Sequence, residues 1–135
     1  MNKLKFAVLC VDDDPVILQL IDLQMKKLVN SENTIVESII DPTQVDEKLI
    51  EIESYGLELL FLMTDYQMPG VSGAQLIRKI KNLNPDLNCV LLSGQANDIE
   101  VAELQNENLL FSFIGKPWME DQMKKILQPL LSKTL

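Results

Sequence analysis

Carboxylates stand at two points of the sequence where apolar runs end. Three consecutive aspartates, beginning at Asp12, follow the apolar residues 6–11, and the largely apolar run 59–64 ends at Asp65. The chain contains no histidine that could neutralise these groups. If the two runs are neighbouring strands, the carboxylates at their ends lie together and repel one another unless a cation binds between them. Mg²⁺ suits such an all-oxygen site, where carboxylates, waters and a phosphoryl group are its usual ligands.

The residue types expected near Asp65 suit phosphoryl transfer. A carboxylate needs no deprotonation before it attacks phosphorus, and aspartyl phosphates are known covalent intermediates. Ser93 ends another apolar run, and Lys116 comes shortly after the run 111–114. The lysine ammonium would balance charge on the phosphoryl oxygens, and the serine hydroxyl would donate a hydrogen bond to another of them.

Each of these residues also has an ordinary structural explanation. Asp14 precedes Pro15, so the aspartate run could be a helix-capping cluster. Ser93 precedes a glycine, which is common in turns, and Lys116 alone could be a surface lysine. The coincidence of all these groups at the ends of successive strand-like runs favours a functional site.

Strand-like and helix-like segments alternate five times along the chain. Short apolar runs indicate strands, and apolar residues three or four positions apart indicate helices. The expected strands are residues 6–11, 34–39, 59–65, 89–93 and 111–114. The expected helices follow the caps Asp14-Pro15, Asp41-Pro42 and Ser72-Gly73, and then occupy residues 98–105 and 119–130. This alternation predicts a doubly wound α/β domain, with a five-stranded parallel sheet and helices on both faces.

Two of the expected helices carry weaker signals. The helix over residues 98–105 has few apolar residues, and we expect it to bury Ile99, Ala102 and Leu104. The last helix contains Pro129, and its regularity should fail near this residue because proline lacks the main-chain N–H.

The composition narrows the class of protein. The 135 residues have a formal net charge of −8, with 47% hydrophobic and 24% charged residues. These values are typical of one globular domain over residues 1–135, and they argue against a nucleic-acid-binding surface, which needs clustered Lys and Arg. No apolar stretch has the length of a membrane span, and we expect no signal peptide. Cys10 and Cys89 fall in strand-like runs, which predicts reduced, buried thiols in a cytoplasmic protein.

Four short motifs stand at the ends of the expected strands. They are Val11-Asp12-Asp13-Asp14-Pro15, Asp65 with Met68-Pro69-Gly70-Val71-Ser72-Gly73, Leu92-Ser93-Gly94, and Lys116-Pro117-Trp118. In this order they resemble the receiver domain of bacterial two-component response regulators, and the resemblance covers essentially the whole chain. It implies the flavodoxin-like strand order 2-1-3-4-5. The stretch 111–118 also resembles receivers joined to output domains, which raises the alternative that the chain is a fragment of a longer regulator.

The resemblance implies a role for each site residue. Asp65 would be the phosphoacceptor and Lys116 the phosphate partner. Mg²⁺ would be held by carboxylates and one main-chain carbonyl, from Asp12, Asp13, Asp65 and Gln67. Ser93 would be the switch hydroxyl and Phe113 the switch aromatic, although a phenylalanine in a strand is by default a core residue. The Lys116-Pro117 bond would be cis.

The resemblance also implies partners. A sensor histidine kinase or a histidine phosphotransfer protein would donate the phosphoryl group. The face formed by the fourth helix, fifth strand and fifth helix would then bind an output domain, a downstream protein or a second copy of the chain. We expect a signalling module, with at most self-phosphorylation from phosphodonors and self-dephosphorylation, because no general acid or base exists beyond the metal ligands.

Three other functions fit the residues less well. A flavodoxin-like cofactor carrier would bind an anionic phosphate after its first strand, where the aspartates would repel it. A phosphatase with an aspartyl nucleophile would place a second acid two residues later, where this chain has Gln67. A degenerate receiver that only binds proteins would have lost the acidic pair, Asp65 or Lys116, and all of these are present.

Overall fold

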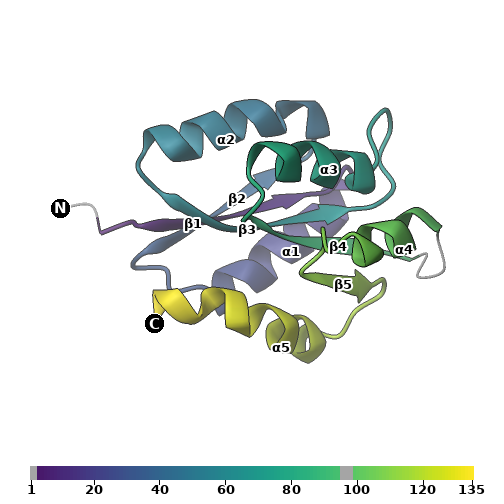
Figure 1. The fold of residues 1–135 in the computed structure, drawn as a ribbon. Coiled ribbons are helices and arrows are strands. Elements are labelled where there is room, and N and C mark those ends of the chain that lie inside the picture. The colour runs from purple at the N-terminus through teal and green to yellow at the C-terminus, as the bar shows by residue number, and fades with distance from the viewer. Residues whose placement is uncertain (1–2, 95–98) are drawn as a thin grey trace.

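Five parallel strands form one sheet in the order β2-β1-β3-β4-β5 (Figure 1). The computed structural model describes residues 3–94 and 99–135. The strands are β1 (Phe6–Val11), β2 (Thr34–Ile39), β3 (Glu58–Asp65), β4 (Asn88–Ser93) and β5 (Ser112–Gly115). This order confirms the predicted flavodoxin-like topology, and it places β1 and β3, the two strands with acidic ends, side by side.

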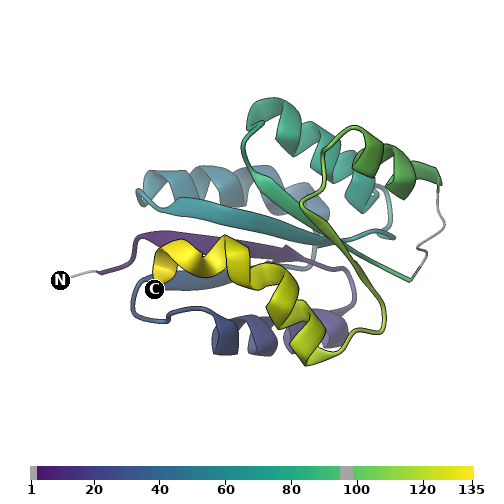
Figure 2. The ribbon, with the colours of Figure 1, turned by 60° about the horizontal axis from the view of Figure 1, so that its bottom comes forward.

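Helices cover both faces of the sheet, as predicted. They are α1 (Pro15–Leu28), α2 (Val45–Ser54), α3 (Gly73–Leu83), α4 (Ile99–Asn106) and α5 (Glu120–Leu131). Helices α1 and α5 pack on one face, and α2, α3 and α4 lie on the other (Figures 1 and 2). Because both faces are covered, the central strands are apolar at nearly every position.

Side chains of β1 alternate between the two cores. Val8 and Cys10 pack in the core against α1 and α5, whereas Leu9 and Val11 face α2 and α3. Cys10 and Cys89 are both free and buried, as the sequence predicts, and burial raises the pKa of both thiols. Within the described residues, no helix combines the length and the apolar character that crossing a membrane requires.

Two of the predicted caps begin the helices that carry the site loops. The Asp14 carboxylate accepts hydrogen bonds from the main-chain N–H groups of Val16 and Ile17, at 2.9 and 3.4 Å. Ser72 and Gln75 form a capping box at the start of α3. Asp41 caps a short 3₁₀ turn (Pro42–Gln44) instead of α2 itself, which begins three residues later at Val45.

The buried residues of α4 differ from those predicted. In α4 the buried residues are Val101 and Leu104, whereas Ile99 is 77% exposed and Ala102 is exposed. The buried residues keep a helical spacing, but the first of them is Val101 instead of Ile99, because Val101 is on the side of α4 that faces the core. The predicted first residue, Asp98, lies outside the described residues. Helix α5 continues past Pro129 to Leu131 and then passes into a 3₁₀ turn (Ser132–Thr134). A proline this close to a helix end removes one hydrogen bond without ending the helix.

Candidate functional site

A hollow of about 480 Å³ lies at the carboxyl ends of the central strands. The strand ends and the loops that follow them supply its lining, which consists of Asp12, Asp13, Asp14, Asp65, Gln67, Ser93, Gly94 and Lys116. Parallel strands bring all their carboxyl ends to one edge of the sheet, and residues up to 104 positions apart in the sequence therefore meet here. The hollow contains every residue predicted for the site except Phe113.

Three carboxylates of this hollow form a compact cluster. One oxygen of each of Asp12, Asp13 and Asp65 lies within 4.8 Å of one oxygen of the others. Asp12 is fully buried, Asp65 is 7% exposed and Asp13 is half-buried. The Asp12 Oδ1 atom accepts a hydrogen bond from the main-chain N–H of Asp14, at 2.9 Å, which fixes the carboxylate at the end of β1.

Lys116 joins the two buried carboxylates. Its Nζ atom lies 2.8 Å from Asp65 Oδ1 and 3.1 Å from Asp12 Oδ2. The lysine reaches them from the loop after β5, where its main-chain N–H donates to the Ser93 carbonyl at 2.9 Å. The charge of one ammonium is thus shared between two carboxylates, and Lys116 is bonded at both ends to elements of the site.

The electrostatics of the site follow from burial. Loss of solvation raises the pKa of Asp65, and the nearby Asp12 charge adds to this effect, while hydrogen bonds from Lys116 and from the Tyr66 main chain oppose it. Burial lowers the pKa of Lys116, but its hydrogen bonds to Asp65 and Asp12 outweigh burial and leave that pKa raised. One lysine therefore offsets only part of the carboxylate repulsion.

The donor set fits a magnesium ion. Asp12, Asp13 and Asp65 offer carboxylate oxygens and no sulfur or imidazole ligand, which is the choice of ligand that Mg²⁺ prefers. The half-buried Asp13 lies at the open side, where an ion could keep part of its hydration shell. Gln67 lines the same hollow from the loop after β3.

The backbone of Asp65 is pressed against the start of α3. A Cβ atom on Gly73 would lie 2.2 Å from the Asp65 carbonyl oxygen and 2.9 Å from Leu91 Cδ1. The Gly73 N–H also donates to the Tyr66 carbonyl at 2.7 Å. Only glycine fits here, so Gly73 helps to set the position of Asp65. In the sequence the Ser72-Gly73 pair indicates a helix start, and it does not indicate this role because the contact joins two elements.

The two predicted switch residues lie in different surroundings. Ser93 is 2% exposed and lines the hollow at the end of β4. Phe113 lies on β5, half-buried, and packs against the core that contains Val101 and Leu104 of α4. The Phe113 side chain therefore lies outside the hollow and packs against the core to which α4 contributes two residues. The Lys116-Pro117 bond is cis, as the resemblance implied.

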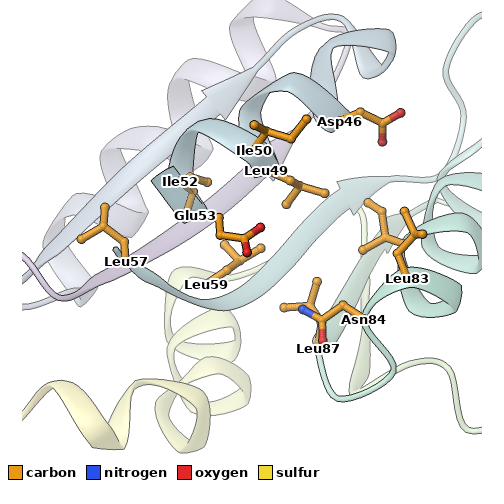
Figure 3. A pocket seen from close by; sticks show the side chains of 11 residues that line it. Asp46, Leu49, Ile50, Ile52, Glu53, Leu57, Leu59, Leu83, Asn84 and Leu87 are labelled. Atoms are coloured by element: carbon orange, nitrogen blue, oxygen red, sulfur yellow. The ribbon is translucent and has the colours of Figure 1, made fainter. Parts of the chain in front are cut away.

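Another hollow, of about 620 Å³, lies between α2 and α3 (Figure 3). Leu49, Ile50, Leu57, Leu59, Leu83 and Leu87 point into it, and Asp46 and Glu53 stand at its α2 side. Although larger, it lacks the convergent carboxylates, hydroxyl and lysine of the first hollow. We therefore place the candidate site at the strand ends.

The comparison with protein families identifies this arrangement. The family model of the response regulator receiver domain matches residues 8–128, a span that contains every predicted site residue. The chain belongs to this family. Members bind Mg²⁺ in an acidic pocket, and the receiver domain is a signalling module of two-component systems rather than a classical enzyme.

Curated relatives agree with the family. The chain is 37% identical over 62 residues to a C4-dicarboxylate transport transcriptional regulatory protein of Rhizobium meliloti, a match that covers 46% of this chain and 13% of that protein. It is 31% identical over 108 residues to a two-component response regulator of Arabidopsis thaliana, covering 76% of this receiver and 51% of that protein. The chain thus spans only part of the length of the relatives it matches.

Solved structures share the fold. A response regulator receiver domain protein from Clostridium thermocellum has a TM-score of 0.74 and 22% identity, with 95% of each chain covered. The isolated receiver domain of RcsB from Salmonella enterica, solved with phosphomimetic BeF₃⁻, has a TM-score of 0.77 and 23% identity, covering 95% of this chain and 89% of that one.

Proposed function

We propose that Asp65 of this receiver domain accepts a phosphoryl group from a histidine of a sensor kinase or a histidine phosphotransfer protein. The observation that carries the proposal is the contact of Lys116 with both Asp65 and Asp12, within a cluster of three carboxylates. Asp12, Asp13, Asp65 and the Gln67 carbonyl would hold Mg²⁺. When bound, the ion would offset the negative charge of the acidic cluster and of the phosphoryl oxygens.

The residues of the chain divide the work of an in-line transfer. A carboxylate oxygen of Asp65 forms a bond to phosphorus while the bond from phosphorus to the donor imidazole nitrogen breaks, and the electron pair of that bond returns to the imidazole. Lys116 would stabilise the negative charge that develops on the phosphoryl oxygens, because its ammonium already lies 2.8 Å from the nucleophilic carboxylate. Ser93 would donate its hydroxyl hydrogen to another phosphoryl oxygen.

The donor must approach through the open side of the hollow. Exposed Asp14 lines the hollow, and α1 begins immediately afterwards and carries exposed Val16, Leu20 and Leu23. These three residues are spaced by four and three positions, so they share one face of α1. We expect this apolar face to contact the histidine-bearing partner.

Phosphorylation would change the surface formed by α4, β5 and α5. Movement of Ser93 toward the phosphoryl group would let Phe113 shift, and Phe113 packs against the core to which α4 contributes Val101 and Leu104. The α4-β5-α5 face carries exposed Ile99 and Phe111, which an output domain, a downstream protein or a second copy could cover. The acidic pair, nucleophile and lysine all converge, which disfavours a degenerate receiver that only binds proteins.

The proposal is tested with a small phosphodonor such as acetyl phosphate in the presence of Mg²⁺. The intact protein should gain the mass of one phosphoryl group, and Asp65→Asn should abolish the gain. Asp86→Asn, at an exposed position outside the hollow, is the matched control and should be phosphorylated as the wild type is. Equal labelling of wild type and Asp65→Asn would refute the assignment.

A further inference from the structure

One carboxylate of α4 contacts both ends of the loop that follows the phosphoacceptor strand. Glu100 Oε2 accepts a hydrogen bond from the Tyr66 hydroxyl at 3.0 Å, and Glu100 Oε1 accepts one from the Ser72 hydroxyl at 3.2 Å. Tyr66 directly follows Asp65, and Ser72 caps α3. The five residues between them include Gln67, which lines the site hollow. Glu100 therefore brackets the loop over residues 66–72.

Tyr66 cannot shift without disturbing the site. It is 7% exposed, its main-chain N–H donates to the Leu92 carbonyl at 2.8 Å, and its carbonyl accepts from Gly73 at 2.7 Å. Tyr66 directly follows β3, and Leu92 immediately precedes Ser93, so Tyr66 is joined to the end of β3 by the chain and to the end of β4 by a hydrogen bond. Displacement of the Tyr66 side chain would therefore also move the main chain beside Asp65.

Within the described residues, helix α4 buries few side chains against the rest of the fold. Only Val101 and Leu104 are buried among its eight residues. Glu103 of α4 and Glu107, just after its end, contact Arg78 of α3 at 3.9 and 2.6 Å, but these side chains are exposed and such pairs contribute little. The hydrogen bonds of Glu100 are part-buried and charge-assisted, so each should be stronger than the exposed ion pairs with Arg78.

We propose that Glu100 is a positioning residue, which couples the placement of α4 to the geometry of the phosphoacceptor loop. With α4 in place, the Glu100 carboxylate holds residues 66–72 in the conformation that presents Gln67 to the acidic cluster. If α4 moves, both hydrogen bonds are lost together and the loop loosens. Because coupling between two sites is reciprocal, a partner that holds α4 would also strengthen binding of Mg²⁺ beside Asp65.

The test compares four single variants of the full chain, together with the double variant that combines Glu100→Ala and Tyr66→Phe. Glu100→Ala removes both bonds. Glu100→Gln loses the charge, but its amide can still pair with both hydroxyls, since a hydroxyl both donates and accepts. Glu103→Ala removes a carboxylate from the same helix face without touching the loop. Tyr66→Phe removes one donor and keeps the ring.

Two measurements distinguish positioning from general destabilisation. The first is amide hydrogen exchange over residues 66–73 in metal-free protein, which needs neither phosphorylation nor Mg²⁺. Glu100→Ala should speed exchange in this loop by about tenfold, within the usual range of coupling between sites. Glu103→Ala should leave it unchanged, and Glu100→Gln, which keeps both hydrogen bonds but loses their charge assistance, should lie between the wild type and Glu100→Ala. Equal exchange in Glu100→Ala and Glu103→Ala, or equal effects of Glu100→Gln and Glu100→Ala, would overturn the proposal.

The second measurement concerns the site, and here the inference rests on the proposed function. The rate of phosphorylation by acetyl phosphate is followed against Mg²⁺ concentration. Glu100→Ala should raise the half-saturating concentration about fivefold or more, with a smaller change in the rate at saturation. Tyr66→Phe should add little on top of Glu100→Ala, because both remove the same contact. Fully additive effects would show that the hydrogen bond between Glu100 and Tyr66 does not position the loop. A wild type that is never phosphorylated would refute the proposed function, and the exchange result would then decide the role of Glu100.

Discussion

At the scale of single residues, the site is an acidic cluster that one lysine does not fully neutralise. Asp65 illustrates this, because burial raises its pKa although Lys116 is 2.8 Å away. A carboxyl group whose pKa is higher in the folded state than in the unfolded state binds more protons when folded. The fold therefore loses stability as the pH rises from the unfolded pKa, near 3.8, through the raised folded value.

The raised pKa of Asp65 gives a prediction for the stability of the metal-free protein. Asp65→Asn cannot ionise, so it should be more stable than the wild type at pH 7, and the difference should shrink as the pH falls toward 4. Urea unfolding in the presence of a chelator measures it, with Asp86→Asn as the control. A wild type that gains stability relative to Asp65→Asn as the pH rises would contradict this account of the site.

At the scale of elements, the close approach of β3 and α3 fixes the nucleophile. Gly73→Ala would place a methyl group 2.2 Å from the Asp65 carbonyl oxygen, so the strand end or the helix must move. We expect a loss of about 1–3 kcal/mol in the free energy of unfolding, as for other overpacked sites, together with slower phosphorylation.

Gly56→Ala is the control for that prediction. Gly56 also has a conformation that disfavours side chains, with φ +72°, but nothing lies within 4 Å of its Cβ position. It should lower stability without changing the rate of phosphorylation per folded molecule. If Gly73→Ala is phosphorylated at the wild-type rate, the contact with Asp65 does not position the nucleophile.

Some features of the individual elements could be predicted from the sequence, and others could not. The buried strands and the caps Asp14 and Ser72 were predictable because apolar runs and capping side chains are local signals. The buried stripe of α4 was not, since Ile99, Ala102 and Leu104 fit the helical spacing nearly as well as Val101 and Leu104. Packing of α4 against the rest of the fold determines which of these residues are buried. The roles of Gly73 and Glu100 depend on contacts across elements, which no local pattern contains.

At the scale of the whole molecule, the acidic cluster should make folding depend on Mg²⁺. Ion binding to the folded state alone stabilises it by about 2.7 kcal/mol at a hundredfold excess over the dissociation constant. Asp13→Asn should raise the stability of the metal-free protein by relieving repulsion, and it should reduce the gain that Mg²⁺ confers. Thermal unfolding with and without Mg²⁺ checks both effects. A wild type whose unfolding is indifferent to Mg²⁺ would show that the cluster is not the metal site.

The central claim is that Asp65 itself carries the phosphoryl group, and its most direct test is to locate that group in the chain. Protein treated with acetyl phosphate and Mg²⁺ is reduced with borohydride, which converts an aspartyl phosphate to homoserine, and its peptides are sequenced by mass spectrometry. The account predicts homoserine at position 65 only when both phosphodonor and Mg²⁺ are present. Modification at Asp12 or Asp13, or at no aspartate of a phosphorylated protein, would contradict it.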